Sequence, residues 1–205
     1  MVKYRIDRTE IKEEAKDFLA DNWVKLALMT FIYYGIVFIG IILLDEILQN
    51  LSLVLDILLL PMYAALIAAI INLVEGKKIK VISLFDFYYK NIGFGLKVSL
   101  ALLISMILVI LGLILFIIPG IIIMMGLAQV MFILFDEPKL KIIDAFKKSW
   151  TMMQGYKMDY FILNLSFLGW GILALLTFGI GLIWLIPYML ITYYLYYKKI
   201  KSANE

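Results

Sequence analysis

Four long stretches of the chain contain no Asp, Glu, Lys or Arg, and they restrict the possible folds more than any other feature. They cover residues 26–44, 57–74, 98–135 and 160–197. The hydrocarbon core of a bilayer is about 30 Å thick, and a helix of roughly 20 residues crosses it. The first two stretches therefore predict one transmembrane helix each. The last two would each be about 57 Å long as continuous helix, so each predicts two transmembrane helices joined by a turn.

Proline and glycine residues locate the two turns. Pro119 and Gly120 predict a turn in the third stretch, and residues 177–181, with two glycines, predict a turn in the fourth. The expected fold is all-α: a polytopic integral membrane protein forming a single membrane domain over residues 1–205. A large soluble helical protein is the alternative, but 64% hydrophobic and 17% charged residues make it improbable. The six expected spans lie near residues 26–44, 57–74, 98–118, 120–135, 160–177 and 181–197.

The basic residues predict the orientation of these spans. With six spans, all 19 Lys and Arg residues fall on one side of the membrane, and Asp45, Glu46 and Asp56 fall on the other. Basic residues are retained in the cytoplasm, so both termini are expected there, in the cytoplasmic (inner) membrane of a prokaryote. Basic residues next to spans also attract anionic lipid headgroups, which makes membrane lipids the expected partners and gives no reason to invoke nucleic acid.

Three cytoplasmic segments have the pattern of amphipathic helices that lie at the membrane interface. The first begins at Asp7, an expected N-cap, and places Ile11, Ala15, Phe18 and Leu19 on one face. The second is residues 81–90. The third, residues 139–154, has an apolar stripe of Leu140, Ile143, Phe146, Trp150 and Met153.

Each amphipathic segment precedes a lysine and a pair of expected spans. The lysines are Lys25, Lys97 and Lys157, and each pair of spans contains an apolar run that ends in proline. This order predicts three degenerate repeats, each an interfacial helix followed by a hairpin. The tyrosines 193, 194, 196 and 197 precede Lys198 and are expected to anchor the last helix at the inner interface.

Few polar side chains occur within the expected spans. Gln129, Asn164 and Ser166 are the candidates for hydrogen bonds between helices or, alternatively, for lining a substrate groove. Ala64, Ala65, Ala68 and Ala69, together with Gly169 and Gly171, are expected to permit close packing of helices. No ionisable residue lies at the middle of a span, which disfavours an ion-coupled pump.

Catalytic chemistry has little support in the sequence. The chain has no Cys and no His, so thiol nucleophiles, imidazole bases and the usual zinc ligands are all missing. No Walker-type phosphate loop and no Gly-x-Ser-x-Gly motif occur. We therefore expect no enzyme activity, no catalytic, cofactor-binding or metal-binding residues, and no cofactor.

One set of residues is spread over the last third of the chain in a recognisable order: Ser149, Trp150, Gly155, Lys157, Gly169, Gly179, Gly181 and Pro187. This order resembles a prokaryotic family of integral membrane proteins known as domain of unknown function 975. The likeness covers about residues 10–198 and is most specific in the last third. That family is similar in layout to the membrane domain attached to some glycerophosphodiester phosphodiesterases, whose hydrolase domain has no counterpart in this sequence. The resemblance implies a six-span membrane protein of undefined biochemistry and supplies no catalytic residues.

Two functions remain as hypotheses. The first is a non-enzymatic component that interacts with lipids or scaffolds a membrane protein partner, favoured by the basic face and the amphipathic segments. The alternative is a transport or export component, or an immunity protein against membrane-active peptides. A groove lined by Gln129, Asn164 and Ser166 would favour transport, whereas a tightly packed bundle would favour the first hypothesis.

Overall fold

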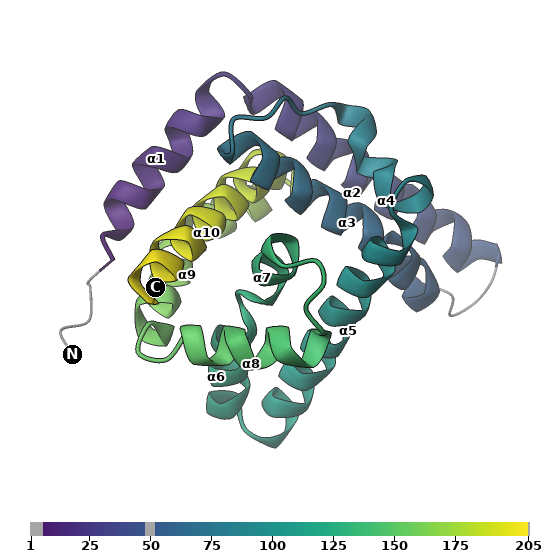
Figure 1. The fold of residues 1–205 in the computed structure, drawn as a ribbon. Helices are drawn as coiled ribbons and strands as arrows, with labels where there is room; N and C mark the ends of the chain where they lie inside the picture. The colour runs from purple at the N-terminus through teal and green to yellow at the C-terminus, as the bar shows by residue number, and fades with distance from the viewer. Residues whose placement is uncertain (1–5, 48–51, 205) are drawn as a thin grey trace.

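The structure, a computed structural model, describes residues 6–47 and 52–204, and every regular element in these ranges is a helix (Figure 1). The six ranges expected to span are mostly helical, with interruptions at Phe116 and at Ala128 and Gln129. The side chains of Asp45, Glu46 and Asp56, expected on the side opposite the lysines, lie outside the described part. The helices are α1 Arg8–Ala20, α2 Trp23–Ile47, α3 Ser52–Val74, the 3-10 helix η1 Val81–Phe85, α4 Asp86–Tyr89, α5 Ile92–Leu115, α6 Ile117–Leu127, α7 Val130–Asp136, α8 Ile142–Met152, α9 Lys157–Leu176 and α10 Leu182–Asn204.

Helix α3 forms the centre of the core. It packs against α2, α5 and α10, and residues on all its sides from Leu59 to Val74 are buried. Three of the four alanines expected to permit close packing, Ala64, Ala65 and Ala69, are buried. A helix that is apolar on every face is stable only when protein or lipid surrounds it. For α3 the surroundings are mostly other helices.

Four helical segments in the described ranges are long and apolar enough to cross a membrane: Trp23–Gly40, Ile92–Leu115, Ile117–Asp136 and Lys157–Leu176. A shorter apolar segment, Leu59–Val74, lies in α3. In contrast to α3, helix α5 exposes most of its leucine and isoleucine side chains. Apolar surface this extensive is typical of proteins that contact a membrane.

The turn between α5 and α6 differs from the prediction. The chain reverses at Phe116, whose backbone is extended, and Pro119 and Gly120 lie in the first helical turn of α6. Proline is tolerated there because the first amides of a helix have no partner within the helix. A Cβ on Gly120 would lie 2.6 Å from the backbone nitrogen of Leu113. Gly120 thus permits close packing of the two helices and does not form the turn itself.

The expected span 120–135 is interrupted. Helix α6 ends at Leu127, Ala128 and Gln129 form a turn, and α7 begins at Val130. Figure 1 shows α7 in the middle of the view, surrounded by the other helices. A break inside an apolar helix leaves backbone groups without helical partners, so neighbouring side chains must satisfy them.

The turn between α9 and α10 lies where it was predicted. Gly179 has a φ of +84°, and the Gly181 N–H donates to Thr177 Oγ1 over 2.8 Å. The expectation for Gly169 and Gly171 is wrong, because a Cβ on either residue would meet no atom within 4 Å. Glycine spacing alone does not reveal whether the facing surface is protein or open.

The residues expected to form the apolar face of α1 pack mainly against the protein. Asp7 is the N-cap, accepting from the amides of Thr9 and Glu10, and Ile11, Ala15 and Leu19 have no exposed surface. The helix lies along α10 (Figure 1). Ion pairs at 3.5 Å from Arg8 to Asp159 and at 2.8 Å from Lys199 to Glu10 tie it to α9 and α10.

Candidate functional site

Helix α8 covers the break between α6 and α7. We call the residues that meet there, with Gly126, Gln129 and Ser149 at the centre, the helix-break site. Ser149 Oγ donates to the Gly126 carbonyl over 2.7 Å and accepts from the Gln129 N–H over 3.3 Å. One hydroxyl thereby satisfies a carbonyl at the end of α6 and an amide at the start of α7. Gln129 is fully buried, and its Nε2 lies 3.5 Å from the sulfur of Met153. Its Oε1 has no hydrogen-bond partner within the described part of the chain.

Three further residues of the family-like motif belong to the helix-break site. The Trp150 ring packs directly on Gly126, at a place where a side chain would collide with it. Lys157 Nζ lies 3.4 Å from the centroid of a Trp150 ring, which is the geometry of a cation–π contact. Gly155, with a φ of +80°, allows the chain to turn from α8 into α9.

The other predicted polar residues lie elsewhere. Tyr193 Oη donates to Asn164 Oδ1 over 2.8 Å and links α10 to α9, while Asn164 Nδ2 donates to the Tyr160 carbonyl of its own helix. Ser166 is exposed, and its hydroxyl donates to the Leu163 carbonyl. Of the three candidates, Asn164 thus connects two helices and Gln129 packs against α8. The contacts described here give them no common partner.

The remaining motif residues lie in the α9–α10 hairpin. A Cβ on Gly181 would lie 2.9 Å from Ala174 Cα, so this glycine permits the two helices to approach closely. Pro187 is buried inside α10. Gly179 forms the turn described above, and Gly169 faces open space.

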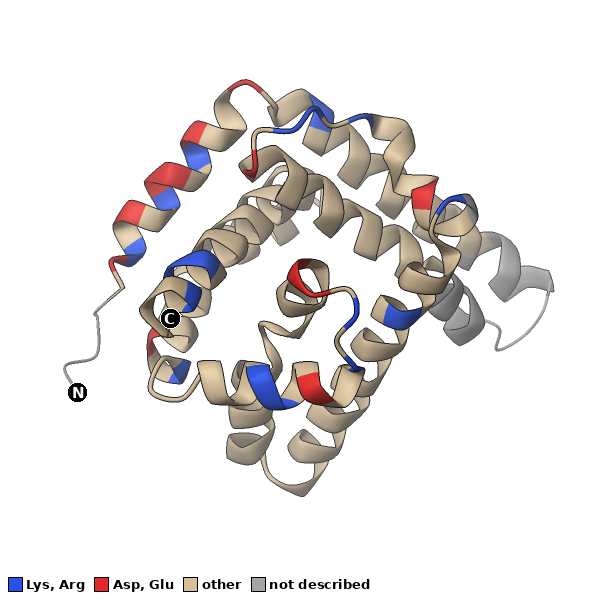
Figure 2. Cartoon of the chain, viewed as in Figure 1, with Lys and Arg blue, Asp and Glu red and all other residues tan. Residues whose placement is uncertain are grey.

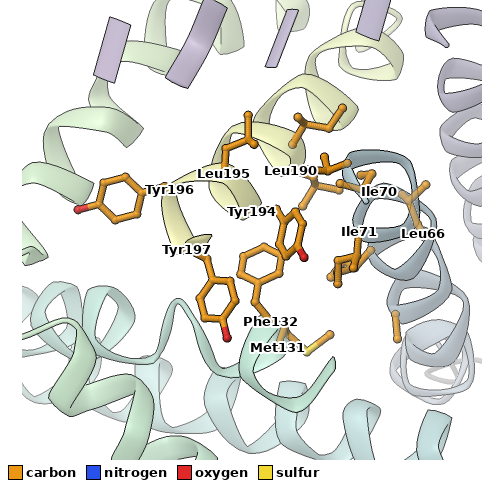
Figure 3. Close-up of a cluster of buried hydrophobic side chains, with 14 of the residues drawn as sticks. Leu66, Ile70, Ile71, Met131, Phe132, Leu190, Tyr194, Leu195, Tyr196 and Tyr197 are labelled. Carbon is orange, nitrogen blue, oxygen red and sulfur yellow. The ribbon is translucent and has the colours of Figure 1, made fainter. Parts of the chain in front are cut away.

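The tyrosines of α10 form part of the core. Tyr194, Tyr196 and Tyr197 are each at most 2% exposed, so the expectation that they anchor α10 at the lipid interface is wrong. Figure 3 shows Tyr194 and Tyr197 beside Phe132 of α7, with Tyr196 projecting to the other side of α10. The tyrosine pattern alone did not reveal this arrangement, because tyrosine suits both an interface and a core that holds acceptors for its hydroxyl.

Two carboxylates accept the hydrogen bonds of these buried tyrosines. Tyr194 Oη donates to Glu75 over 3.3 Å, and Tyr197 Oη donates to Asp136 over 2.7 Å. Asp136 also pairs with Lys201 at 2.7 Å. The ends of α3, α7 and α10 are thereby joined. Neither carboxylate could be assigned this role from the sequence, because their partners lie 119 and 61 residues away.

Charged residues gather on one part of the structure. Figure 2 shows them on α1, on the segment after α3, around the start of α8 and at the end of α10, while most of α5 and α6 carries none. Within residues 6–47 and 52–204, no three His, Cys, Asp or Glu side chains lie together as a metal site would require.

The described part of the structure has surface grooves in three places. The α1–α10 groove, about 570 Å³, is lined by Lys16, Trp23, Trp170, Leu173, Ala174, Thr177, Gly181, Trp184, Leu185 and Tyr188. The α1–α3 groove, about 620 Å³, is lined by Asp17, Phe18, Asp21, Asn22, Lys25, Leu73, Gly76, Lys77, Lys78, Ile79 and Lys80. The α5–α8 groove has a part of about 590 Å³ and an adjoining part of about 390 Å³, which share Leu108 and Phe146. Gln129, Asn164 and Ser166 line none of these three grooves.

Fold and surface together define an all-helical protein with several helices long and apolar enough for a membrane. The family described as protein of unknown function DUF975 matches residues 53–204, about three quarters of the chain, and the chain belongs to this family. No curated protein and no solved structure matches it.

Proposed function

We propose that the protein is a non-enzymatic, lipid-interacting component of the cytoplasmic membrane of a prokaryote. In this proposal it crosses the membrane six times, as the hairpins α2–α3, α5 to α7 and α9–α10, and both termini are cytoplasmic. Two observations support this arrangement. Four helical segments are long and apolar enough to cross a membrane, and all 19 basic residues fall outside the six charge-free spans, in the terminal segments and in the segments that join the hairpins.

The α1–α10 groove is the observation that carries the lipid-interacting role. Its walls are almost entirely apolar and include three of the four tryptophans of the chain, which suits the acyl chain of a lipid. Lys16 is the only ionised residue in the lining and can meet a headgroup phosphate. Lipid is the occupant that matches both features.

Paired variants of α9 test this role. Leu173 lines the groove and Leu168 does not, and both are exposed leucines. Native mass spectrometry of the detergent-purified chain should detect a retained phospholipid that depends on this groove. Leu173→Gln and Lys16→Gln should lower its occupancy severalfold, and Leu168→Gln and Lys198→Gln should not. Equal retention in all four variants, or no retained lipid, would contradict the proposal.

Helix α1 places a lysine beside the middle of α9, so whether α9 crosses the membrane needs a direct test. The α9–α10 turn is the place for that test, because it lies outside the cell if both helices cross. Lys12 Nζ lies 3.4 Å from the Ser166 carbonyl and 4.1 Å from the centroid of the Phe167 ring, beside the middle of α9. If α9 crosses the membrane, the lysines of α1 must extend to the headgroups or thin the bilayer locally. A cysteine at the fully exposed Phe178 should then react with an impermeant maleimide from outside the cell, and one at Lys80 only from inside. Reaction of residue 178 from inside would contradict six crossings.

A transport role has one observation in its favour. The interrupted span α6–α7, with the unpartnered Oε1 of Gln129, resembles the broken helices that line substrate sites in transporters. Against it, Gln129, Asn164 and Ser166 line none of the three grooves described above. The lipid-interacting role therefore has the stronger support, and a substrate bound at Gln129 would reverse this order.

A further inference from the structure

The α5–α8 groove combines an apolar floor with a rim of lysines. Lys97 comes from α5, Lys139 and Lys141 from the segment before α8, and Lys147 from α8 itself. The apolar lining consists of Ile104, Leu108, Ile123, Leu127, Ile142, Ile143, Phe146 and Trp150. Along α5, Lys97 and Leu108 are about 16 Å apart, so the groove runs from charged to apolar over roughly half the thickness of a bilayer core.

The lysines of this groove lack acidic partners. Of the nearby carboxylates, Asp136 pairs with Lys201 and Glu137 pairs with Lys148. Asp144, three residues from both Lys141 and Lys147, is exposed on α8 and is not part of the groove lining, so four lysines face at most one nearby carboxylate. In the described ranges, Lys139, Lys141 and Lys147 form no ion pair, and Lys97 Nζ donates to the Pro138 carbonyl over 2.6 Å. Several uncompensated cations around one groove attract a ligand with negative charge.

The α1–α3 groove provides the contrast. It also contains four lysines, residues 25, 77, 78 and 80, but Asp17 and Asp21 lie among them and Lys77 pairs with Glu75. Its charges are therefore largely balanced within the protein. The two grooves differ in charge compensation and not in lysine count.

We propose that the α5–α8 groove binds an anionic phospholipid, with headgroup phosphate at Lys97, Lys139 and Lys141 and an acyl chain along Ile104 and Leu108. The cationic rim complements the phosphate, and the apolar floor complements the chain at the depth where lipid would lie. The inference deepens the proposed lipid-interacting role by naming a second site and its headgroup class. It does not require the α1–α10 groove to hold lipid.

Native mass spectrometry of the full-length protein tests this site with two lipids that have identical acyl chains, phosphatidylglycerol and phosphatidylcholine. The wild-type protein should retain phosphatidylglycerol preferentially. Lys139→Gln/Lys141→Gln should weaken this binding about thirty-fold, because two juxtamembrane lysines usually contribute that much to the affinity for anionic lipid. The matched pair Lys78→Gln/Lys80→Gln should change it by less than about threefold. Lys139→Arg/Lys141→Arg should restore it and exclude a folding defect.

The outcomes separate the two lipid proposals. Equal retention of the two lipids, or equal losses in the two double variants, would overturn the α5–α8 site. Loss of phosphatidylglycerol in Lys139→Gln/Lys141→Gln but not in Leu173→Gln would support it even if the α1–α10 groove proved empty. The converse result would leave the α1–α10 groove as the lipid site and overturn this one.

Discussion

Helices α1 and α8 show how differently two amphipathic segments of similar sequence pattern can be used. The apolar residues Ile11, Ala15 and Leu19 of α1 are all fully buried against the protein. On α8, Ile143 is 67% exposed and Trp150 is 37% exposed, while the small residues Ala145 and Ser149 face inward. Small residues let α8 approach the broken helix α6–α7 closely, while Ile143 and part of Trp150 remain exposed. The hydrophobic pattern therefore identifies both helices but not the surroundings of their apolar faces.

The largest difference should appear when a leucine or isoleucine is truncated on each helix. Leu19→Ala leaves a cavity in a packed core and should cost about 2–4 kcal/mol of unfolding free energy. Ile143→Ala removes mostly exposed surface and should cost under about 0.5 kcal/mol in the same detergent. Circular dichroism during titration with a denaturing detergent measures both. Similar losses in the two variants would mean that the apolar faces of α1 and α8 are equally buried.

A serine variant tests how α8 supports the helix break. Ser149→Ala leaves the Gly126 carbonyl and the Gln129 amide without their partner, and we expect a loss of about 1–3 kcal/mol. Ser166→Ala is the matched control, because that serine is exposed and its hydroxyl bonds only within its own helix. The same denaturation experiment should show almost no change for Ser166→Ala. A stable Ser149→Ala protein would mean that water or another group closes the break.

The sequence predicted the helices well because their lengths depend on local composition. Helix α3 ends at Val74, as the charge-free stretch predicts, and the α9–α10 turn lies at residues 177–181. The break at Ala128 and Gln129 was missed because neither residue forbids a helix. It depends on Ser149, twenty residues further along, to satisfy the freed backbone. Ser149 was singled out only through the family resemblance and Trp150 also through the apolar stripe of residues 139–154, but the sequence alone assigned neither of them a contact.

A smaller effect is expected from the contact between Lys157 and Trp150. Lys157→Gln removes the cation above the indole ring and should cost about 0.5–1 kcal/mol, the usual range for a solvent-accessible cation–π contact. Lys157→Arg should retain most of the stability, because guanidinium also stacks on indole. Denaturation with Trp150 fluorescence as the probe, in a variant whose other three tryptophans are phenylalanine, reports directly on the ring. Equal stability of the Gln and Arg variants would show that the charge contributes nothing to α8 docking.

The smallest effect concerns Lys12, where α1 meets α9. Burial beside Phe167, followed by repulsion from Lys16, lowers the pKa of Lys12 below its ordinary value of 10.5. Between the lowered value and 10.5 the unfolded chain binds more protons than the folded one, so stability should rise with pH across that window. Lys12→Met removes this group and should flatten the rise. Lys12→Arg stays charged throughout and should flatten it as well, without the gain in stability at neutral pH that Lys12→Met brings. Thermal melts in detergent from pH 8 to 10.5 give the melting temperature of the three proteins as a function of pH. Parallel profiles would contradict the lowered pKa of Lys12 and the close contact between α1 and α9 on which it depends.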